Sequence, residues 1–157
     1  MKTSFVETMR GSLTTQDGLK HPLDFEIKAE APSLLRFLRD GTLQLSGVLH
    51  ASPWASEVPA AGTMEIALAH GRIGYRLRFG TFRLEGDKRV RPAALLPSMT
   101  TLPVTLSDSA GTQLATGEVR FDLRDLPGFL RSFLPFRRLA QQRLDEKRRN
   151  VEQRPAA

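Results

Sequence analysis

The sequence predicts an all-β protein, an antiparallel β-sandwich or barrel of about eight strands with a short helical plug and a C-terminal helix. Apolar and polar residues alternate along most of the chain, and turn-forming dipeptides recur at short intervals. Strands do not alternate with long helical segments, which disfavours a parallel sheet. The 157 residues suffice for one domain with a single apolar core.

The first two predicted strands, residues 5–13 and 23–29, are joined by the turn dipeptide Asp17-Gly18. Both show period-two alternation, so each is expected to bury one face. In the first strand that face carries Phe5, Glu7, Met9, Gly11 and Leu13.

A change of period follows at residues 32–39. Leu34, Leu35 and Leu38 recur at helical spacing, Pro32 suits a first helical turn, and Asp40-Gly41 ends the segment. We therefore expect a short helical plug at one end of the sheet, followed by a strand over residues 43–49.

The second half of the chain carries the remaining strands. Residues 51–61, which contain two prolines and the single tryptophan, are predicted to form a loop. Alternation predicts strands at 64–68, 73–79, 82–85, 102–106 and 113–123. Turns or connections are predicted at His70-Gly71, near Gly86-Asp87, at 91–99 and at Asp108–Gly111.

The C-terminal segment differs in composition from the rest. We divide the chain into a β domain, residues 1–134, and a basic helix and tail, residues 135–157. The whole chain has a net charge of +6, and the tail has a net charge of +4. Its candidate contacts to an anionic membrane or an acidic partner are Arg137, Arg138, Arg143, Lys147, Arg148 and Arg149. Alternatively, residues 126–134 dock on the sheet while the basic remainder extends into solvent or pairs with a second chain.

Composition excludes several classes of function and location. The absence of cysteine excludes disulfides, thiolate nucleophiles and cysteine–zinc sites. No run approaches the roughly 20 apolar residues of a membrane-spanning helix. Glu7 and Arg10 interrupt the apolar stretch that a secretory signal needs, so we expect a cytoplasmic location, with peripheral membrane contact through the tail as an addition.

Catalytic and cofactor motifs are not found. The chain has no nucleophile elbow, phosphate loop or dinucleotide fingerprint. His21, His50 and His70 lack the spacing of metal ligands and are interpreted as turn or surface residues. Asp24 and Glu26 share a strand face that we interpret as solvent-facing. We therefore predict no catalytic residue, no cofactor and no metal.

The candidate contact residues in the β domain are Trp54, Arg72, Arg76 and Arg78. Alternation places the three arginines on one sheet face, where they could hold a phosphate, a carboxylate or a nucleic-acid backbone, or form a solvated polar face. Tyr75 and Phe79 fall on the opposite face, which disfavours nucleic acid because bases stack on aromatic rings beside the cations. Trp54 is expected either to contact a ligand or partner, or to cap the end of the barrel.

Several short segments resemble the β-rich accessory region of bacterial cholesterol-oxidase-like oxidoreductases of the glucose–methanol–choline class. They are Phe5-Val-Glu-Thr-Met-Arg-Gly11, Tyr75-Arg-Leu-Arg-Phe79, Leu84-Glu-Gly86-Asp-Lys88, Thr100-Thr101-Leu102 and Gly117-Glu-Val-Arg-Phe-Asp-Leu123, the last followed by Leu126 and Phe129. The resemblance implies a free-standing accessory domain associated with lipid or steroid metabolism. Because the flavin fingerprint and a hydrolase nucleophile are missing, no catalytic residue is carried over.

Together these observations favour a non-catalytic binding or accessory module for an apolar, lipid- or steroid-like molecule or for a lipid-processing enzyme. The alternative is an adaptor that docks on a protein partner or an anionic membrane through its basic C-terminal helix.

Overall fold

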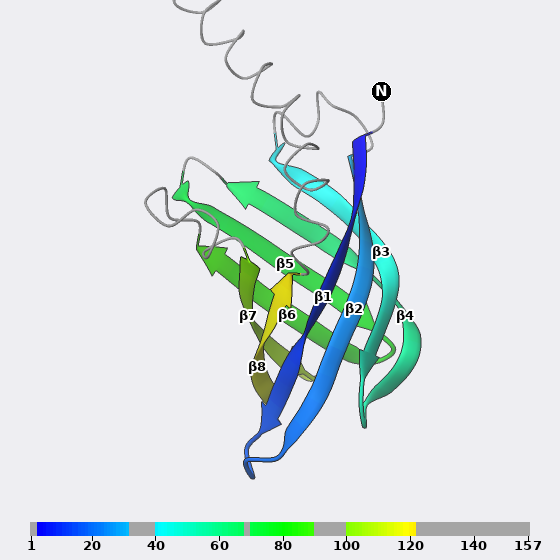
Figure 1. Ribbon diagram of the computed structural model, residues 1–157, viewed down its shortest axis with the longest axis vertical. Coiled ribbons are helices and arrows are strands. Elements are labelled where there is room, and N and C mark those ends of the chain that lie inside the picture. Colours follow the sequence, from blue (N-terminus) through cyan, green and yellow to red (C-terminus); the bar gives the residue numbers. More distant parts are fainter. Residues whose placement is uncertain (1–2, 32–39, 68–69, 90–99, 122–157) are drawn as a thin grey trace, which may run out of the picture.

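The structure is a computed structural model that describes residues 3–31, 40–67, 70–89 and 100–121 (Figure 1). These residues form eight strands: β1 (Thr3–Thr15), β2 (Lys20–Ala31), β3 (Thr42–Ala51), β4 (Ala55–Ala67), β5 (Arg72–Phe79), β6 (Phe82–Arg89), β7 (Thr101–Ser107) and β8 (Gln113–Phe121). No helix within the described residues is long and apolar enough to cross a lipid bilayer.

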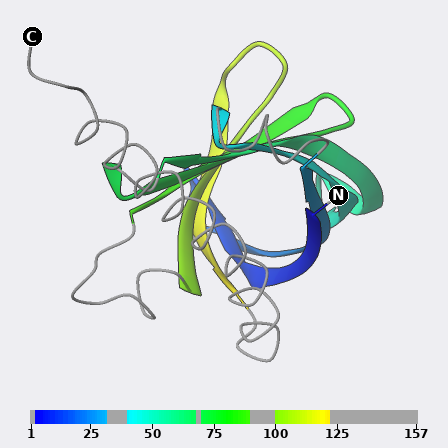
Figure 2. The same cartoon turned by 90° about the horizontal axis from the view of Figure 1, so that it is seen from above.

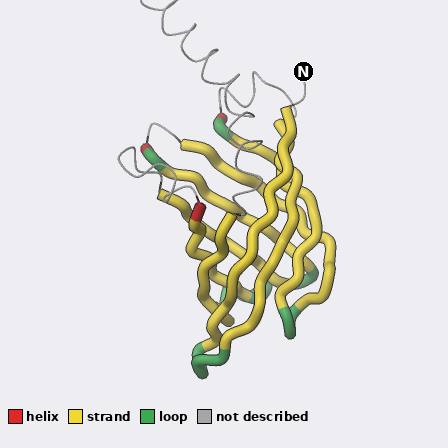
Figure 3. Tube along the Cα trace, viewed as in Figure 1, coloured by secondary structure: helices red, strands yellow, loops and turns green. Residues whose placement is uncertain are grey.

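The strands form a closed barrel in which each is antiparallel to its neighbours in sequence. β1 closes the ring against β8, with Met9 opposite Phe121 and Thr15 opposite Ala115. Figure 2 shows the ring from above, and Figure 3 shows the strands running between its two ends. The prediction of an all-β antiparallel architecture is confirmed, and of the two alternatives the structure is a barrel. The predicted helical plug at 32–39, the C-terminal helix and the domain boundary at 134 lie outside the described residues.

Two hairpin turns follow the predicted chemistry. Gly18, with a φ of 85°, lets the chain reverse after β1, and its N–H donates to the Thr15 carbonyl at 2.9 Å. In the β7–β8 turn the Asp108 carboxylate accepts hydrogen bonds from the backbone N–H groups of Ala110 and Thr112, both at 2.9 Å. An aspartate side chain that accepts hydrogen bonds from the N–H groups two and four residues further along the chain stabilises the turn.

Alternation sends one set of side chains into the barrel. In β2 every second residue from Leu23 to Ala31 is buried, and the residues between them are exposed or half-buried. The inward-facing set forms one apolar core that is contributed by all eight strands. Burial of this surface is the main force that stabilises the fold.

Interior glycines allow neighbouring strands to approach closely. A Cβ atom at Gly62 would lie 1.8 Å from the Arg76 carbonyl oxygen, and one at Gly47 would lie 2.0 Å from the Glu26 carbonyl oxygen. Both positions therefore require glycine so that a strongly coiled sheet can close into a small barrel.

Two predictions about the path of the chain were wrong. Residues 51–61 do not form a loop throughout, because β4 already begins at Ala55. Over its first residues β4 pairs with β3 alone, and Pro59, opposite Val48, is tolerated there because no second strand needs its missing N–H. A bulge also interrupts the alternation, with Glu57 at a φ of 48°.

Gly86-Asp87 does not form a turn either. Both residues lie inside β6, and the reversal between β5 and β6 occurs at Gly80, whose φ is 55°. Gly86 instead allows a close approach, because a Cβ atom there would lie 2.7 Å from the Pro103 carbonyl oxygen. Because β6 continues past Gly86, it includes Lys88, which lies at a buried position of the strand.

Candidate functional site

The apolar interior contains one polar cluster, which consists of Glu7, Tyr75 and Lys88. Among the described residues, Glu7 and Lys88 are the buried charged side chains, at 0% and 2% exposure. The Tyr75 hydroxyl donates to the Glu7 carboxylate, 3.0 Å from Oε2 and 3.2 Å from Oε1. Lys88 Nζ lies 5.7 Å from the centroid of the Tyr75 ring, within the range of a cation–π contact.

Three strands bring the cluster together. Glu7 is in phase with inward-facing Met9 on β1, and Lys88 is in phase with inward-facing Leu84 on β6. Tyr75 projects inward from β5, directly opposite Gly86 on β6.

The cluster lies beside the shortest ladder of the barrel, between β6 and β7. The β6–β7 pairing ends at Gly86 and Val104, so Lys88 has a paired neighbour on the β5 side only. Among the described residues, the β1–β8 pairing ends at Met9 and Phe121, and Glu7 is opposite Ile27 of β2. Lys88 thus lies on β6 beyond the last residue paired with β7, and Glu7 lies on β1 two residues before Met9.

Burial shifts the ionisation of all three groups. It raises the pKa of Glu7 to about 7, although the neighbouring Lys88 and the hydrogen bond from Tyr75 oppose the rise. It lowers the pKa of Lys88, against the attraction of Glu7. Burial and the Glu7 carboxylate raise the pKa of Tyr75 well above its usual value, so the phenol remains a hydrogen-bond donor at neutral pH.

These shifts predict a pH dependence of stability. The pKa of Glu7 is about 7 in the folded protein and 4.5 in the unfolded chain, so the folded state binds this proton more tightly. The stabilisation is therefore complete below pH 4.5 and is lost as the pH rises through 7, by about 3 kcal/mol at most. Urea unfolding of wild type and Glu7→Gln from pH 4.5 to 8 checks this. The difference in free energy of unfolding between the two proteins should change with pH. A difference that stays constant from pH 4.5 to 8 would contradict the prediction.

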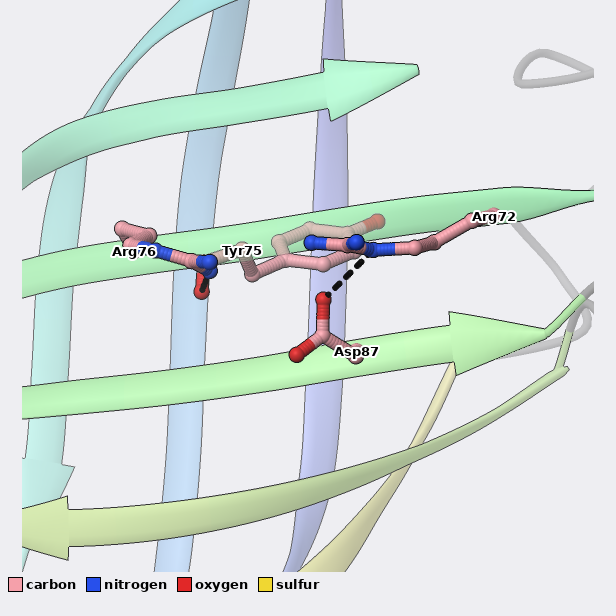
Figure 4. Close-up of polar contacts among 4 residues, drawn as sticks. All are labelled: Arg72, Tyr75, Arg76 and Asp87. Atoms are coloured by element: carbon pink, nitrogen blue, oxygen red, sulfur yellow. Dashed lines mark hydrogen bonds and ion pairs between the residues drawn. The ribbon is translucent and has the colours of Figure 1, made fainter. Parts of the chain in front are cut away.

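The predicted arginine ladder lies on the outer face of the barrel, away from the cluster. Arg72 Nε pairs with Asp87 Oδ1 at 3.1 Å across β5 and β6, and Arg76 Nη1 donates to the Tyr75 carbonyl oxygen at 3.4 Å (Figure 4). Arg76 and Arg78 line an open groove of about 520 Å³ over β3–β6. Its other polar lining residues are Gln44, Thr63, Arg83 and Glu85.

Trp54 lies at the opposite end of the barrel from Lys88, in the turn between β3 and β4. It is half-buried against the core, and its ring contacts His21 edge-on at a centroid distance of 5.1 Å. The structure therefore separates Trp54 from the cluster of Glu7, Tyr75 and Lys88. The six basic candidates of the tail, Arg137 to Arg149, lie outside the described residues.

Sequence reasoning did not identify Glu7 and Lys88 as site residues. Glu7 had been placed on the apolar face of its strand, and a carboxylate in phase with core residues was the available signal. Lys88 was missed because the glycine before it indicated a turn. Neither signal showed that Glu7 and Lys88 belong to one cluster. Glu7 lies on β1 and Lys88 on β6, and β7 and β8 lie between these strands in the ring.

No protein-family model and no curated protein matches this chain. Within the described ranges, no three histidine, aspartate or glutamate side chains gather as metal ligands would.

Proposed function

We propose that this protein is a non-catalytic binding module for one neutral, apolar molecule that carries a single hydroxyl or carbonyl group. The molecule lies at the end of the barrel interior that holds Glu7, Tyr75 and Lys88. An eight-stranded barrel is wide enough to be filled by its own side chains or to hold one small ligand.

The observation that carries the proposal is the polar cluster in an otherwise apolar interior. Burying charged groups is costly, and well-packed apolar residues in their place often stabilise a protein more. Apolar walls with a few converging polar groups are typical of small-molecule sites. The described inward-facing side chains are buried, so a ligand would displace side chains near the cluster rather than enter an open cavity.

The charge of the cluster favours a neutral ligand. Glu7 and Lys88 balance each other, and an added carboxylate would bring a second buried negative charge beside Glu7. A hydroxyl or carbonyl group can instead exchange hydrogen bonds with the phenol, the amine and the carboxyl group without adding charge.

The resemblance to oxidoreductase accessory regions supports the same ligand class. The segments that carry it include residues 5–11, 75–79 and 84–88, and each of these contributes one member of the cluster. Lipid or steroid metabolism, which the resemblance implies, supplies neutral apolar molecules with one polar group.

Native mass spectrometry of gently purified full-length protein is the direct test. We expect a bound mass that denaturation releases as a lipid or sterol. In a second assay, 1-dodecanol should displace the neutral dye N-phenyl-1-naphthylamine from the protein at least about tenfold more effectively than dodecanoate does. Equal displacement by both would contradict the charge argument, and no binding of dye or alcohol would contradict the function.

A matched pair of variants locates the ligand. Tyr75→Phe removes a cluster hydroxyl and should weaken dodecanol binding by about tenfold, the loss of roughly one hydrogen bond. Arg78→Gln, on the outer face of the same strand, should leave it unchanged. Equal effects of the two changes would place the ligand elsewhere.

The outer groove favours a second candidate function, contact with an acidic protein partner. Arg76, Arg78 and Arg83 line it against a single carboxylate, Glu85. The double variant Arg76→Gln/Arg78→Gln should lose salt-sensitive binding to poly-glutamate, whereas deletion of residues 136–157 tests the tail. If only the deletion weakens binding, the groove is not the contact surface.

A further inference from the structure

We propose that Lys88 captures an apolar aldehyde or ketone as a reversible imine, with Glu7 as its proton donor and counter-ion. This inference rests on the proposed function, because it requires the ligand to enter the barrel interior beside the cluster. It narrows the ligand class from neutral molecules with one polar group to those that carry a carbonyl group.

The geometry places the necessary groups in one site. The Lys88 amine lies 5.7 Å from the centroid of the Tyr75 ring. The hydroxyl of the same tyrosine lies 3.0 Å from Glu7 Oε2. An amine, a phenol and a carboxyl group thus converge from three strands inside an apolar barrel, where water does not compete for them.

Burial also supplies reactive protonation states. An amine attacks a carbonyl carbon only when it is unprotonated, and desolvation lowers the pKa of the Lys88 amine. The pKa of Glu7 is about 7, so its carboxyl group holds a proton in a large fraction of molecules near neutral pH. Both shifts favour the form of the pair in which the amine is unprotonated and the carboxyl group holds a proton.

The chemistry balances without a redox partner. The Lys88 nitrogen forms a bond to the carbonyl carbon while the carbonyl oxygen takes the Glu7 proton, which gives a carbinolamine. The nitrogen then passes one proton by way of Glu7 to the new hydroxyl group, the C–O bond breaks as water leaves, and the nitrogen lone pair forms the C=N bond. Overall, one carbonyl compound, the Lys88 amine and the Glu7 carboxylic acid give one protonated imine, one water molecule and the Glu7 carboxylate, which balances the charge.

The described surface lysines provide internal controls. Lys20 is exposed, and Lys28 pairs with Glu30 at 2.7 Å on the outer face with 49% of its side chain exposed. Both amines lie in water on the outside of the barrel, so neither has the apolar surroundings and the neighbouring carboxyl group that Lys88 has.

The test traps the imine in the full-length protein. Protein is incubated with limiting dodecanal and sodium cyanoborohydride, and the dodecyl adduct is located by peptide mapping. We expect one adduct per chain at Lys88, formed at least about tenfold faster than adducts at Lys20 and Lys28. Excess 1-dodecanol should suppress it by occupying the same site. Equal labelling of all three lysines, or no effect of dodecanol, would overturn the proposal.

Variants separate the roles of the groups. Lys88→Arg keeps the charge and should abolish the adduct, whereas Lys28→Arg should leave labelling of Lys88 unchanged. Glu7→Gln removes the proton donor and should slow adduct formation by about tenfold or more. An undiminished rate in Glu7→Gln would overturn the role of Glu7. The dodecanol competition uses wild-type protein, so the proposal stays testable even if a variant does not fold.

The outcomes also distinguish this inference from the proposed function. If dodecanol displaces the dye but dodecanal leaves no adduct at Lys88, the imine proposal fails and the binding function stands. If neither compound binds, the proposed function fails and the imine proposal with it.

Discussion

Replacing Lys88 with methionine is expected to destabilise the barrel by about 1–2 kcal/mol more at pH 8 than at pH 5. The change keeps the length and apolar character of the side chain but removes the positive charge that balances Glu7. Without that charge the pKa of Glu7 rises further, so at pH 8 the buried carboxyl group keeps its proton, which costs about 1.4 kcal/mol for each pH unit above 7. At pH 5 the carboxyl group is protonated in the folded state, because its pKa lies near 7 even with Lys88 present.

The double variant Glu7→Gln/Lys88→Met separates charge from packing. Glutamine still accepts the hydrogen bond from Tyr75, so the double variant should lie within about 1 kcal/mol of wild type at pH 8. Urea unfolding, followed by the fluorescence of the single tryptophan, gives the free energy of unfolding of wild type, Lys88→Met and the double variant at both pH values. Arg89→Met, at the exposed position after Lys88, is the matched control and should change stability by less than about 0.5 kcal/mol. If Lys88→Met lowers the free energy of unfolding equally at both pH values, the electrostatic explanation is contradicted.

Replacing Gly62 with valine is expected to prevent the barrel from closing. The new Cβ atom would lie 1.8 Å from the Arg76 carbonyl oxygen, and neither β4 nor β5 can move away without breaking the ladder between them. The cost should exceed the about 1–3 kcal/mol of ordinary overpacking, because the clash is with backbone rather than with a side chain that can change rotamer. Circular dichroism and thermal unfolding should show loss of cooperative β-structure.

Ala61→Val is the control for this second prediction. Ala61 precedes Gly62 on β4 and faces solvent, so valine there adds the same side chain to the outer face. We expect its stability to stay within about 0.5 kcal/mol of wild type, since β-branched residues suit strands. If Gly62→Val unfolds at the same temperature as Ala61→Val, the close approach of β4 and β5 is not essential.

Local patterns were sufficient to predict most of the architecture. Period-two alternation in β2 and β5, together with the Asp17-Gly18 turn, depends on residues close in sequence, so it can be recognised without tertiary information. The inward direction of Tyr75 and the outward direction of Arg72, Arg76 and Arg78 followed from the same alternation and are confirmed. β4 was harder to predict, because Pro59 is acceptable only where β4 has a single paired neighbour, which the sequence alone does not show.

The amino-acid sequence by itself therefore determined which residues face the core in most of the strands, and with them the all-β antiparallel class. Only the tertiary structure decided that the sheet closes into a barrel and that Glu7, Tyr75 and Lys88 meet inside it. The hydrogen bond between Tyr75 and Glu7 joins residues 68 positions apart, and it exists because β1 closes the ring against β8. The raised pKa of Glu7 has the same origin, since it arises from burial by the whole barrel and not from any neighbour in the sequence.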